Sequence, residues 1–79
     1  MLTIYSKERC QYCDMAKALL KSKDIPFEEV RIDLDQSARE FIVSEGHRTV
    51  PQIYKDGKLF VKGGFAGLRQ LTESELKAA

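Results

Sequence analysis

Hydrophobic and polar positions change their spacing along this chain in a way that predicts alternating strands and helices. Residues 2–5 alternate as a short strand does, whereas residues 11–23 place their apolar side chains at helical spacing. Pro26 cannot continue that helix, so we expect the helix to end shortly before it. Residues 27–32 then form the second predicted strand.

A second helix is predicted in the middle of the chain. Ser37 stands three residues before Glu40, which is the spacing of a capping box at a helix start. Gly46 is a typical stop signal after the last apolar position. We therefore expect a helix that begins at Ser37 and ends before Gly46.

The last third of the chain predicts a hairpin followed by helix. Residues 50–54 and 59–62 read as strands, and the Asp56-Gly57 pair between them favours a tight antiparallel turn. The helical tail repeats the capping-box spacing at Thr72 and Glu75. The tail is therefore expected to contain two short helices that meet near Thr72.

Taken in order, these elements predict an α/β fold of the sequence β-α-β-α-β-β-α. The first two strands are joined by a crossover helix, so they should be parallel with a right-handed connection. The hairpin adds two antiparallel strands, which gives a mixed four-stranded sheet with helices on both faces. With 79 residues the chain has room for one core, and we expect a single domain over residues 1–79.

Charge and hydropathy exclude several classes of partner. The 13 basic and 12 acidic side chains give a net charge of +1, which does not supply the dense basic face that nucleic acid requires. No apolar run approaches the roughly 18–20 residues that span a bilayer. The first residues lack the basic and apolar regions of a signal peptide. We expect a cytoplasmic monomer that binds neither nucleic acid nor membrane.

The chemistry centres on two cysteines at a predicted strand-to-helix junction. Cys10 and Cys13 are separated by two residues, a spacing that closes too small a loop to staple the fold. The free N–H groups of the helix start, together with Lys7 and Arg9, would stabilise a thiolate at Cys10. Cys10 is therefore the expected nucleophile and Cys13 the resolving thiol.

Two other interpretations of this pair remain open. A structural zinc site needs about four ligands, whereas the chain has two cysteines and one histidine, so we expect no metal. The two cysteines could also be unreactive core residues, because a free thiol packs as a small hydrophobic group. Their position after a polar turn favours redox chemistry instead.

Four segments in order and spacing resemble the glutaredoxin family over nearly the whole chain. They are Ile4–Lys7, Cys10–Cys13, Thr49–Ile53 and Gly63–Phe65. The likeness is to the compact dithiol glutaredoxins of bacteria and bacteriophages. The resemblance implies the thioredoxin fold and an oxidoreductase that needs no tightly bound cofactor and uses glutathione as a co-substrate.

The resemblance also implies a glutathione groove. In that family the proline after Thr-Val is cis and faces the cysteines, so Pro51 is expected to be cis. The implied groove residues are Lys7, Tyr12, Thr49, Val50, Pro51, Gly64 and Phe65. Lys7 would pair with a glutathione carboxylate, although a solvated surface lysine is an equal alternative. For Arg48, carboxylate binding and a solvated loop charge are equally open.

The chain departs from the family pattern at two places. Gln11 follows the first cysteine where many glutaredoxins have proline, which would alter the thiol chemistry. Ala66 and Gly67 stand where glutathione-using members commonly carry acidic residues that meet the γ-glutamyl amino group. The Gly-Phe turn at Phe65 resembles the redoxins that supply electrons to ribonucleotide reductase and are recharged by thioredoxin reductase. Phe65 is either a contact for such a partner or a core residue.

Three functions follow from this resemblance. The first is glutathione-dependent reduction of protein disulfides and glutathione mixed disulfides, with ribonucleotide reductase among the targets. The second is a redoxin recharged by thioredoxin reductase. The third is a non-enzymatic module that binds a [2Fe–2S] cluster, which thiolate ligation would permit. Retention of Cys13 favours disulfide exchange over cluster binding.

Overall fold

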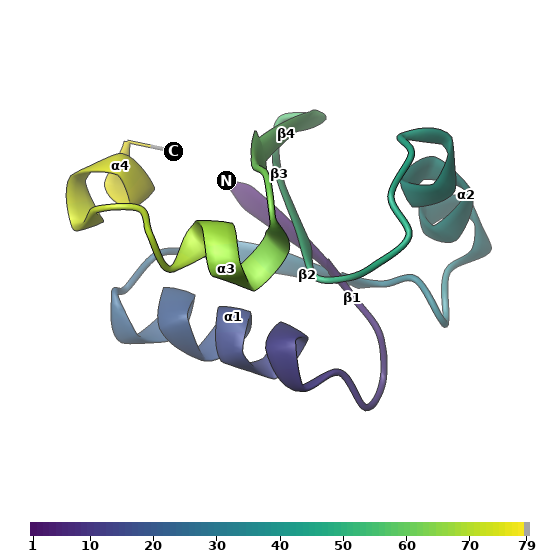
Figure 1. Ribbon diagram of the computed structural model, residues 1–79, viewed down its shortest axis with the longest axis horizontal. Coiled ribbons are helices and arrows are strands. Elements are labelled where there is room, and N and C mark those ends of the chain that lie inside the picture. The colour runs from purple at the N-terminus through teal and green to yellow at the C-terminus, as the bar shows by residue number, and fades with distance from the viewer. Residues whose placement is uncertain (79) are drawn as a thin grey trace.

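The computed structural model describes residues 1–78 and has eight elements of secondary structure (Figure 1). In chain order they are β1 (Leu2–Ser6), α1 (Gln11–Ser22), β2 (Phe27–Arg31), α2 (Gln36–Ser44), β3 (Gln52–Lys55), β4 (Lys58–Val61), α3 (Gly64–Leu68) and α4 (Glu73–Lys77). The predicted order of elements is confirmed. The helical tail is split as expected, and Thr72 and Glu75 form the capping box at the start of α4.

The four strands form one mixed sheet in the order β2-β1-β3-β4. β1 pairs with β2 in parallel and with β3 antiparallel, and Ile4 stands beside both Glu29 and Ile53. β3 and β4 are joined by Asp56 and Gly57, which both have positive φ. That backbone is what a two-residue hairpin turn needs, so the predicted hairpin and the predicted thioredoxin-type sheet are confirmed.

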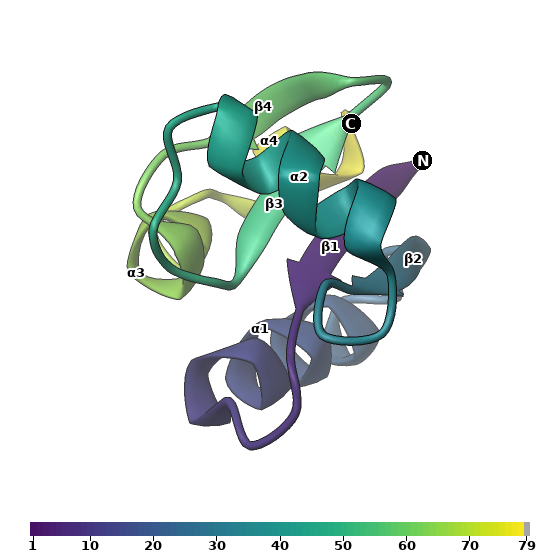
Figure 2. The ribbon, with the colours of Figure 1, turned by 90° about the vertical axis from the view of Figure 1, so that its right-hand side faces the viewer.

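Helices cover both faces of the sheet, as Figures 1 and 2 show: α1 and α3 lie side by side on one face and α2 lies on the other. The face under α1 holds the buried aliphatic core, which comprises Leu2, Ile4, Ala16, Leu20, Ile25, Ile53, Leu68 and Leu76. On the opposite face, Phe41 of α2 packs against Tyr5 and Tyr54, with ring centroids 5.7 and 5.3 Å away. The alternation of β1 and β3 thus directs Ile4 and Ile53 to one face of the sheet and Tyr5 and Tyr54 to the other.

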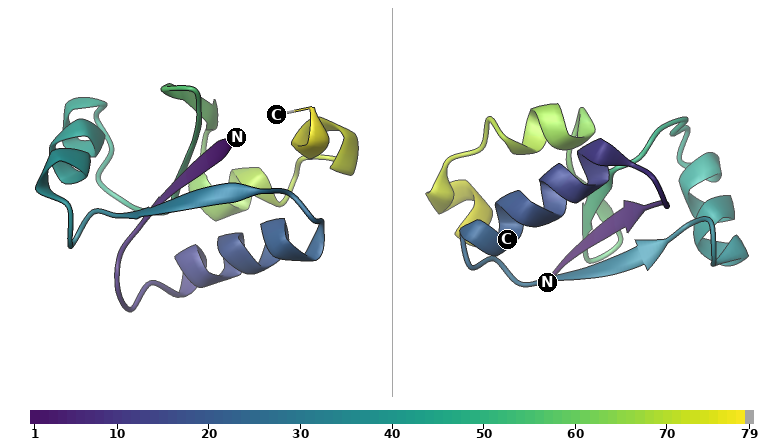
Figure 3. Two further views of the ribbon diagram at one scale, coloured as in Figure 1. Left: turned by 180° about the vertical axis from the view of Figure 1, so that it is seen from behind. Right: turned by 90° about the horizontal axis from the view of Figure 1, so that it is seen from below.

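The last helix closes the core beside the first strand. Figure 3 shows α4 close to the N-terminal end of β1, and Leu2 and Leu76 are both about 1% exposed in the same cluster. Within residues 1–78, no helix combines the length and the apolar character needed to cross a membrane.

The prediction that α2 begins at Ser37 is wrong. The helix begins at Gln36, and Asp35 is its N-cap, with Oδ1 accepting a hydrogen bond of 3.1 Å from the Ala38 amide. Asp35 has the extended backbone that an N-cap requires, so Ser37 falls inside the first turn. The third strand also begins later than predicted, at Gln52, because the two residues before it form the bend that contains Pro51.

We therefore predict that Asp35→Ala lowers the free energy of unfolding by about 1 kcal/mol, because one amide at the start of α2 loses its acceptor. A chain of this size should show a fall in Tm of roughly 4–8 °C. Ser37→Ala is the matched control and should change Tm little, since Ser37 is exposed within the helix. Thermal unfolding followed by circular dichroism distinguishes the two caps, and an equal loss in both variants would contradict this assignment.

Candidate active site

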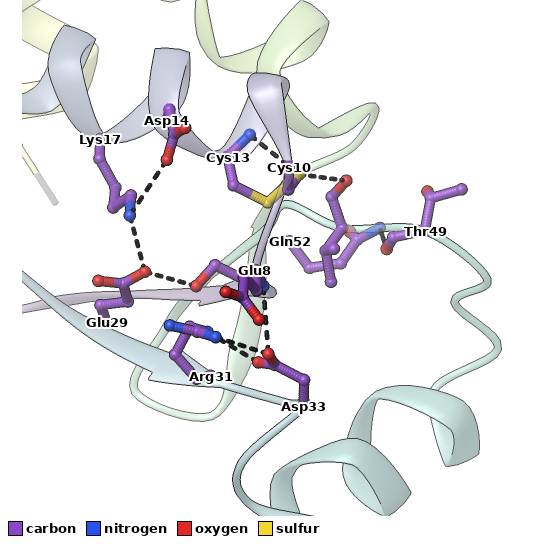
Figure 4. Close-up of a disulfide and its surroundings, with 12 residues drawn as sticks. Glu8, Cys10, Cys13, Asp14, Lys17, Glu29, Arg31, Asp33, Thr49 and Gln52 are labelled. Atoms are coloured by element: carbon purple, nitrogen blue, oxygen red, sulfur yellow. Dashed lines mark hydrogen bonds and ion pairs between the residues drawn. A yellow bond between two sulfur atoms is a disulfide. The ribbon is translucent and has the colours of Figure 1, made fainter.

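Cys10 and Cys13 form a disulfide at the point where the loop after β1 enters α1 (Figure 4). Cys10 is the N-cap of α1, and its Sγ accepts a hydrogen bond of 3.2 Å from the Cys13 amide. Cys10 is 8% exposed, whereas Cys13 is fully buried. An attacking group from outside therefore reaches Cys10 first, and Cys13 is protected behind it.

The loop between β1 and α1, which contains Cys10, turns sharply and is hydrogen-bonded to the segment that follows β2. Arg9 has a φ of +56°, a conformation that few residues other than glycine adopt readily. The Glu8 amide donates to Asp33, whose carboxylate also receives two short hydrogen bonds from Arg31. The Arg31 guanidinium holds the pKa of Asp33 at about 2, so this anchor stays charged at neutral pH.

A second polar network connects α1 with β1 and β2 near the disulfide (Figure 4). The Ser6 hydroxyl donates to Glu29 at 2.6 Å, and the Lys17 ammonium donates to the same carboxylate at 2.9 Å. The Ser6 hydroxyl and then Lys17 lower the pKa of Glu29, and the hydrogen bond that Lys17 donates to Glu29 raises the pKa of Lys17. Both groups are therefore ionised at neutral pH, and Lys17 lies one helical turn after Cys13 on α1.

The opposite wall of the site is the loop that contains Pro51. The Val50–Pro51 peptide bond is cis, as the family resemblance led us to expect. The Val50 carbonyl oxygen lies 3.7 Å from Cys10 Sγ, which places this bend directly against the disulfide. The Gln52 side chain donates to the Thr49 carbonyl at 2.8 Å and closes the bend.

Gly64 allows the start of α3 to approach this bend. Its φ is +57°, and a Cβ atom there would lie 2.8 Å from the Pro51 carbonyl oxygen. Such a contact is closer than any side chain tolerates. Because residue 64 is glycine, the Pro51 bend and the start of α3 can lie in contact and form one continuous wall of the site.

An open groove of about 1070 Å³ runs along this wall. It brings together six of the predicted groove residues, namely Tyr12, Thr49, Val50, Pro51, Gly64 and Phe65. The Tyr12 and Phe65 rings stack with centroids 6.1 Å apart, and Tyr12 is 62% exposed. The lining of the groove therefore combines two stacked aromatic rings, Tyr12 from α1 and Phe65 from α3, with the bend that contains Pro51.

Lys7 is placed differently from the other predicted residues. It is exposed in the loop between β1 and α1 and does not line the groove. Lys62 and Arg69 line it instead, together with Arg48. No local pattern indicates Lys62 and Arg69, because they reach the site only through the way β4 and α3 pack.

Gly67 explains part of the departure from the glutaredoxin pattern. A Cβ atom at this position would collide with the Lys62 carbonyl oxygen. An acidic side chain at residue 67 is therefore incompatible with this backbone. Ala66 is exposed and lines the groove, so it has room for a larger side chain.

One further feature borders the groove on the side of α2. The buried Tyr54 hydroxyl donates to Glu45 at 3.0 Å and lies 2.7 Å from His47 Nε2. Burial, then the hydrogen bond to Glu45, raises the pKa of Tyr54 to about 12. Glu45 and His47 both line the groove, so this network holds its far end in place. Across residues 1–78, no three His, Cys, Asp or Glu side chains are grouped so that they could hold a metal ion.

Comparison with known sequences places these features in one family. The sequence profile of the glutaredoxin family matches residues 2–60. Glutaredoxin 3 of Escherichia coli K12 is 48% identical over 56 residues, which cover 70% of this chain and 68% of that protein. The glutaredoxin-like protein NrdH of Lactococcus lactis (strain IL1403) is 38% identical over 60 residues, covering 76% of this chain and 83% of that protein.

Solved structures share the same fold. The buckwheat glutaredoxin in its glutathione complex matches with a TM-score of 0.75 at 23% identity. The match covers 98% of this chain and 73% of the buckwheat chain.

Proposed function

We propose, from the premise that the chain belongs to the glutaredoxin family, that it reduces two kinds of disulfide through Cys10 and Cys13. They are the disulfides of proteins and the mixed disulfides that proteins form with glutathione. A family member with this cysteine pair is a dithiol oxidoreductase. The observation that carries the division of roles is the difference in exposure between the two cysteines. Cys10, at the N-cap of α1, is 8% exposed, whereas Cys13 is fully buried one turn further along.

The proposed reaction is two successive thiol–disulfide exchanges. The Cys10 thiolate attacks one sulfur of the target disulfide, and the other sulfur leaves as a thiolate that takes up a proton. Cys13 then loses its proton and attacks Cys10 Sγ, which releases the second target sulfur as a thiol. The target has gained two electrons and two protons, and the protein is left with the Cys10–Cys13 disulfide.

Glutathione is the proposed reductant that restores the dithiol. Two glutathione molecules would supply the two electrons and leave as glutathione disulfide. The solved buckwheat glutaredoxin is a glutathione complex, which supports a similar use of the groove here. The Val50 backbone would pair with the extended tripeptide, beside Tyr12 and Gly64, and Lys7 would add charge from the outer loop. We assign the reaction to the cytoplasm, where thiols are kept reduced.

A second candidate is recharging by thioredoxin reductase, as in redoxins that supply ribonucleotide reductase. Three observations favour it. The chain is 38% identical to a glutaredoxin-like NrdH protein, residue 67 has no room for an acidic side chain, and Phe65 is only half-buried beside Tyr12. A half-buried aromatic ring on the groove rim is suited to contact a protein partner.

Turnover of a small disulfide distinguishes the two reductants. The pure protein would be assayed with glutathione, glutathione reductase and NADPH, and separately with thioredoxin reductase and NADPH. We expect turnover with glutathione that partly survives Cys13→Ser, because Cys10 alone can exchange glutathione. Turnover with thioredoxin reductase alone, abolished by Cys13→Ser, would establish the second candidate. Absence of turnover in both systems would contradict the proposed function.

The groove also predicts a gain of function at Ala66. Ala66→Asp should lower KM for glutathione about fivefold, since one charge-assisted hydrogen bond to the γ-glutamyl ammonium contributes about 1 kcal/mol. Ala66→Asn is the control of equal size without the charge. Steady-state kinetics with varied glutathione measure the effect. If the Asp and Asn variants have the same KM, the ammonium is not bound beside residue 66.

A further inference from the structure

The groove beside Cys10 is positively charged although the chain as a whole is nearly neutral. The chain has 13 basic and 12 acidic side chains, yet the groove is lined by three cations and one carboxylate. Arg48 lies on the Pro51 wall, Lys62 follows β4, and Arg69 ends α3. Positive charge therefore reaches the groove from three separate segments of the chain.

These three cations are available to a ligand. Arg48, Lys62 and Arg69 are exposed, and within residues 1–78 their charged groups make neither an ion pair nor a hydrogen bond. By contrast, Lys17 and Arg31 are already paired with carboxylates at 3.5 Å or less. The field of the groove cations is thus not cancelled by partners within the described chain.

The negative charges near the groove are already engaged or lie outside it. Glu45, the carboxylate in the lining, accepts a hydrogen bond from the buried Tyr54 hydroxyl. Asp14 faces Lys17 at 3.5 Å, and Glu8 is exposed on the loop before Cys10, outside the lining. A ligand with an ammonium group would therefore find little to pair with, whereas a ligand rich in carboxylates would meet three unpaired cations.

The size of the groove suits a peptide segment. Its volume of about 1070 Å³ lies just above the range of about 300–1,000 Å³ that is usual for small-molecule sites. In an extended segment successive side chains point to opposite sides. Carboxylates near the target cysteine could therefore reach Arg48, Lys62 and Arg69 from neighbouring positions of such a segment.

We propose that the groove selects protein disulfides whose cysteine lies in an extended acidic segment, with Arg48, Lys62 and Arg69 binding its Asp and Glu side chains. This proposal rests on the disulfide exchange proposed above and adds the class of protein target to it. Complementary charge mainly speeds encounter and sets register, so it acts on the association of the target.

The test uses disulfide-bonded peptides that differ only in the residues flanking their cysteines, which are Glu, Gln or Lys. The pre-reduced protein is mixed with each peptide, and the second-order rate constant of its oxidation is measured. No reductase is present, so the result is independent of how the protein is recharged. We expect the Glu peptide to react about tenfold faster than the Gln peptide at low salt, and the Lys peptide to react slowest. This advantage should shrink as ionic strength rises.

Matched variants locate the effect. Arg48→Gln, Lys62→Gln and Arg69→Gln should each lower the Glu-to-Gln rate ratio roughly two- to threefold relative to wild type. Lys21→Gln and Lys58→Gln remove exposed lysines that do not line the groove, and they should leave the ratio unchanged.

Three results would overturn the proposal: equal rates for the Glu and Gln peptides, an advantage for the Lys peptide, or equal losses in the groove and control variants. Failure of every peptide to oxidise the reduced protein would instead overturn the disulfide exchange itself. The two failures are therefore distinguishable.

Discussion

The hydrogen bond from the Cys13 amide to Cys10 Sγ is the interaction on which the site depends. It makes a sulfur atom the N-cap of α1, and it places that sulfur where the unpaired amides of the first turn favour negative charge. β1 and the turn at Arg9 fix the position of Cys10. The strand lies in the centre of the sheet between β2 and β3, and the turn leads from its end to the start of α1. The same first turn buries Cys13, so one helix start gives the two sulfurs different environments.

A second constraint is the close approach of two backbone segments near Cys10, the Pro51 bend and the start of α3. The Pro51 carbonyl oxygen faces the start of α3, and Gly64 leaves out the side chain that would block this approach. Gly67 makes a similar approach to Lys62 possible on the next turn. These contacts form a groove whose lining includes the Pro51 bend and the stacked Tyr12 and Phe65 rings. They also exclude a side chain at residue 67, so the charged residues of the groove are Arg48, Lys62, Arg69 and Glu45.

The fold and the reactive pair follow from local patterns and six of the groove residues from the family motifs, whereas the basic residues Lys62 and Arg69 in the groove do not. A few neighbouring residues are enough to indicate the first strand, through the alternation in residues 2–5, and the hairpin, through Asp56-Gly57. The structure contains both the strand and the hairpin. The start of α2 was misjudged because Asp35 and Ser37 both suit an N-cap, and only the folded backbone decides between them. Lys62 and Arg69 join Arg48 through packing across more than a dozen residues of sequence, so no spacing rule indicates them.

The central claim is that Cys10 is the reactive thiolate and Cys13 its buried partner. Limited alkylation of the reduced protein with iodoacetamide at neutral pH, followed by mass spectrometry of the two cysteines, tests it most directly. An ordinary thiol is only a few per cent ionised at neutral pH, so a capped thiolate should be alkylated at least about tenfold faster. The account predicts that Cys10 is modified first by such a margin. Equal modification of both thiols, or earlier modification of Cys13, would contradict it.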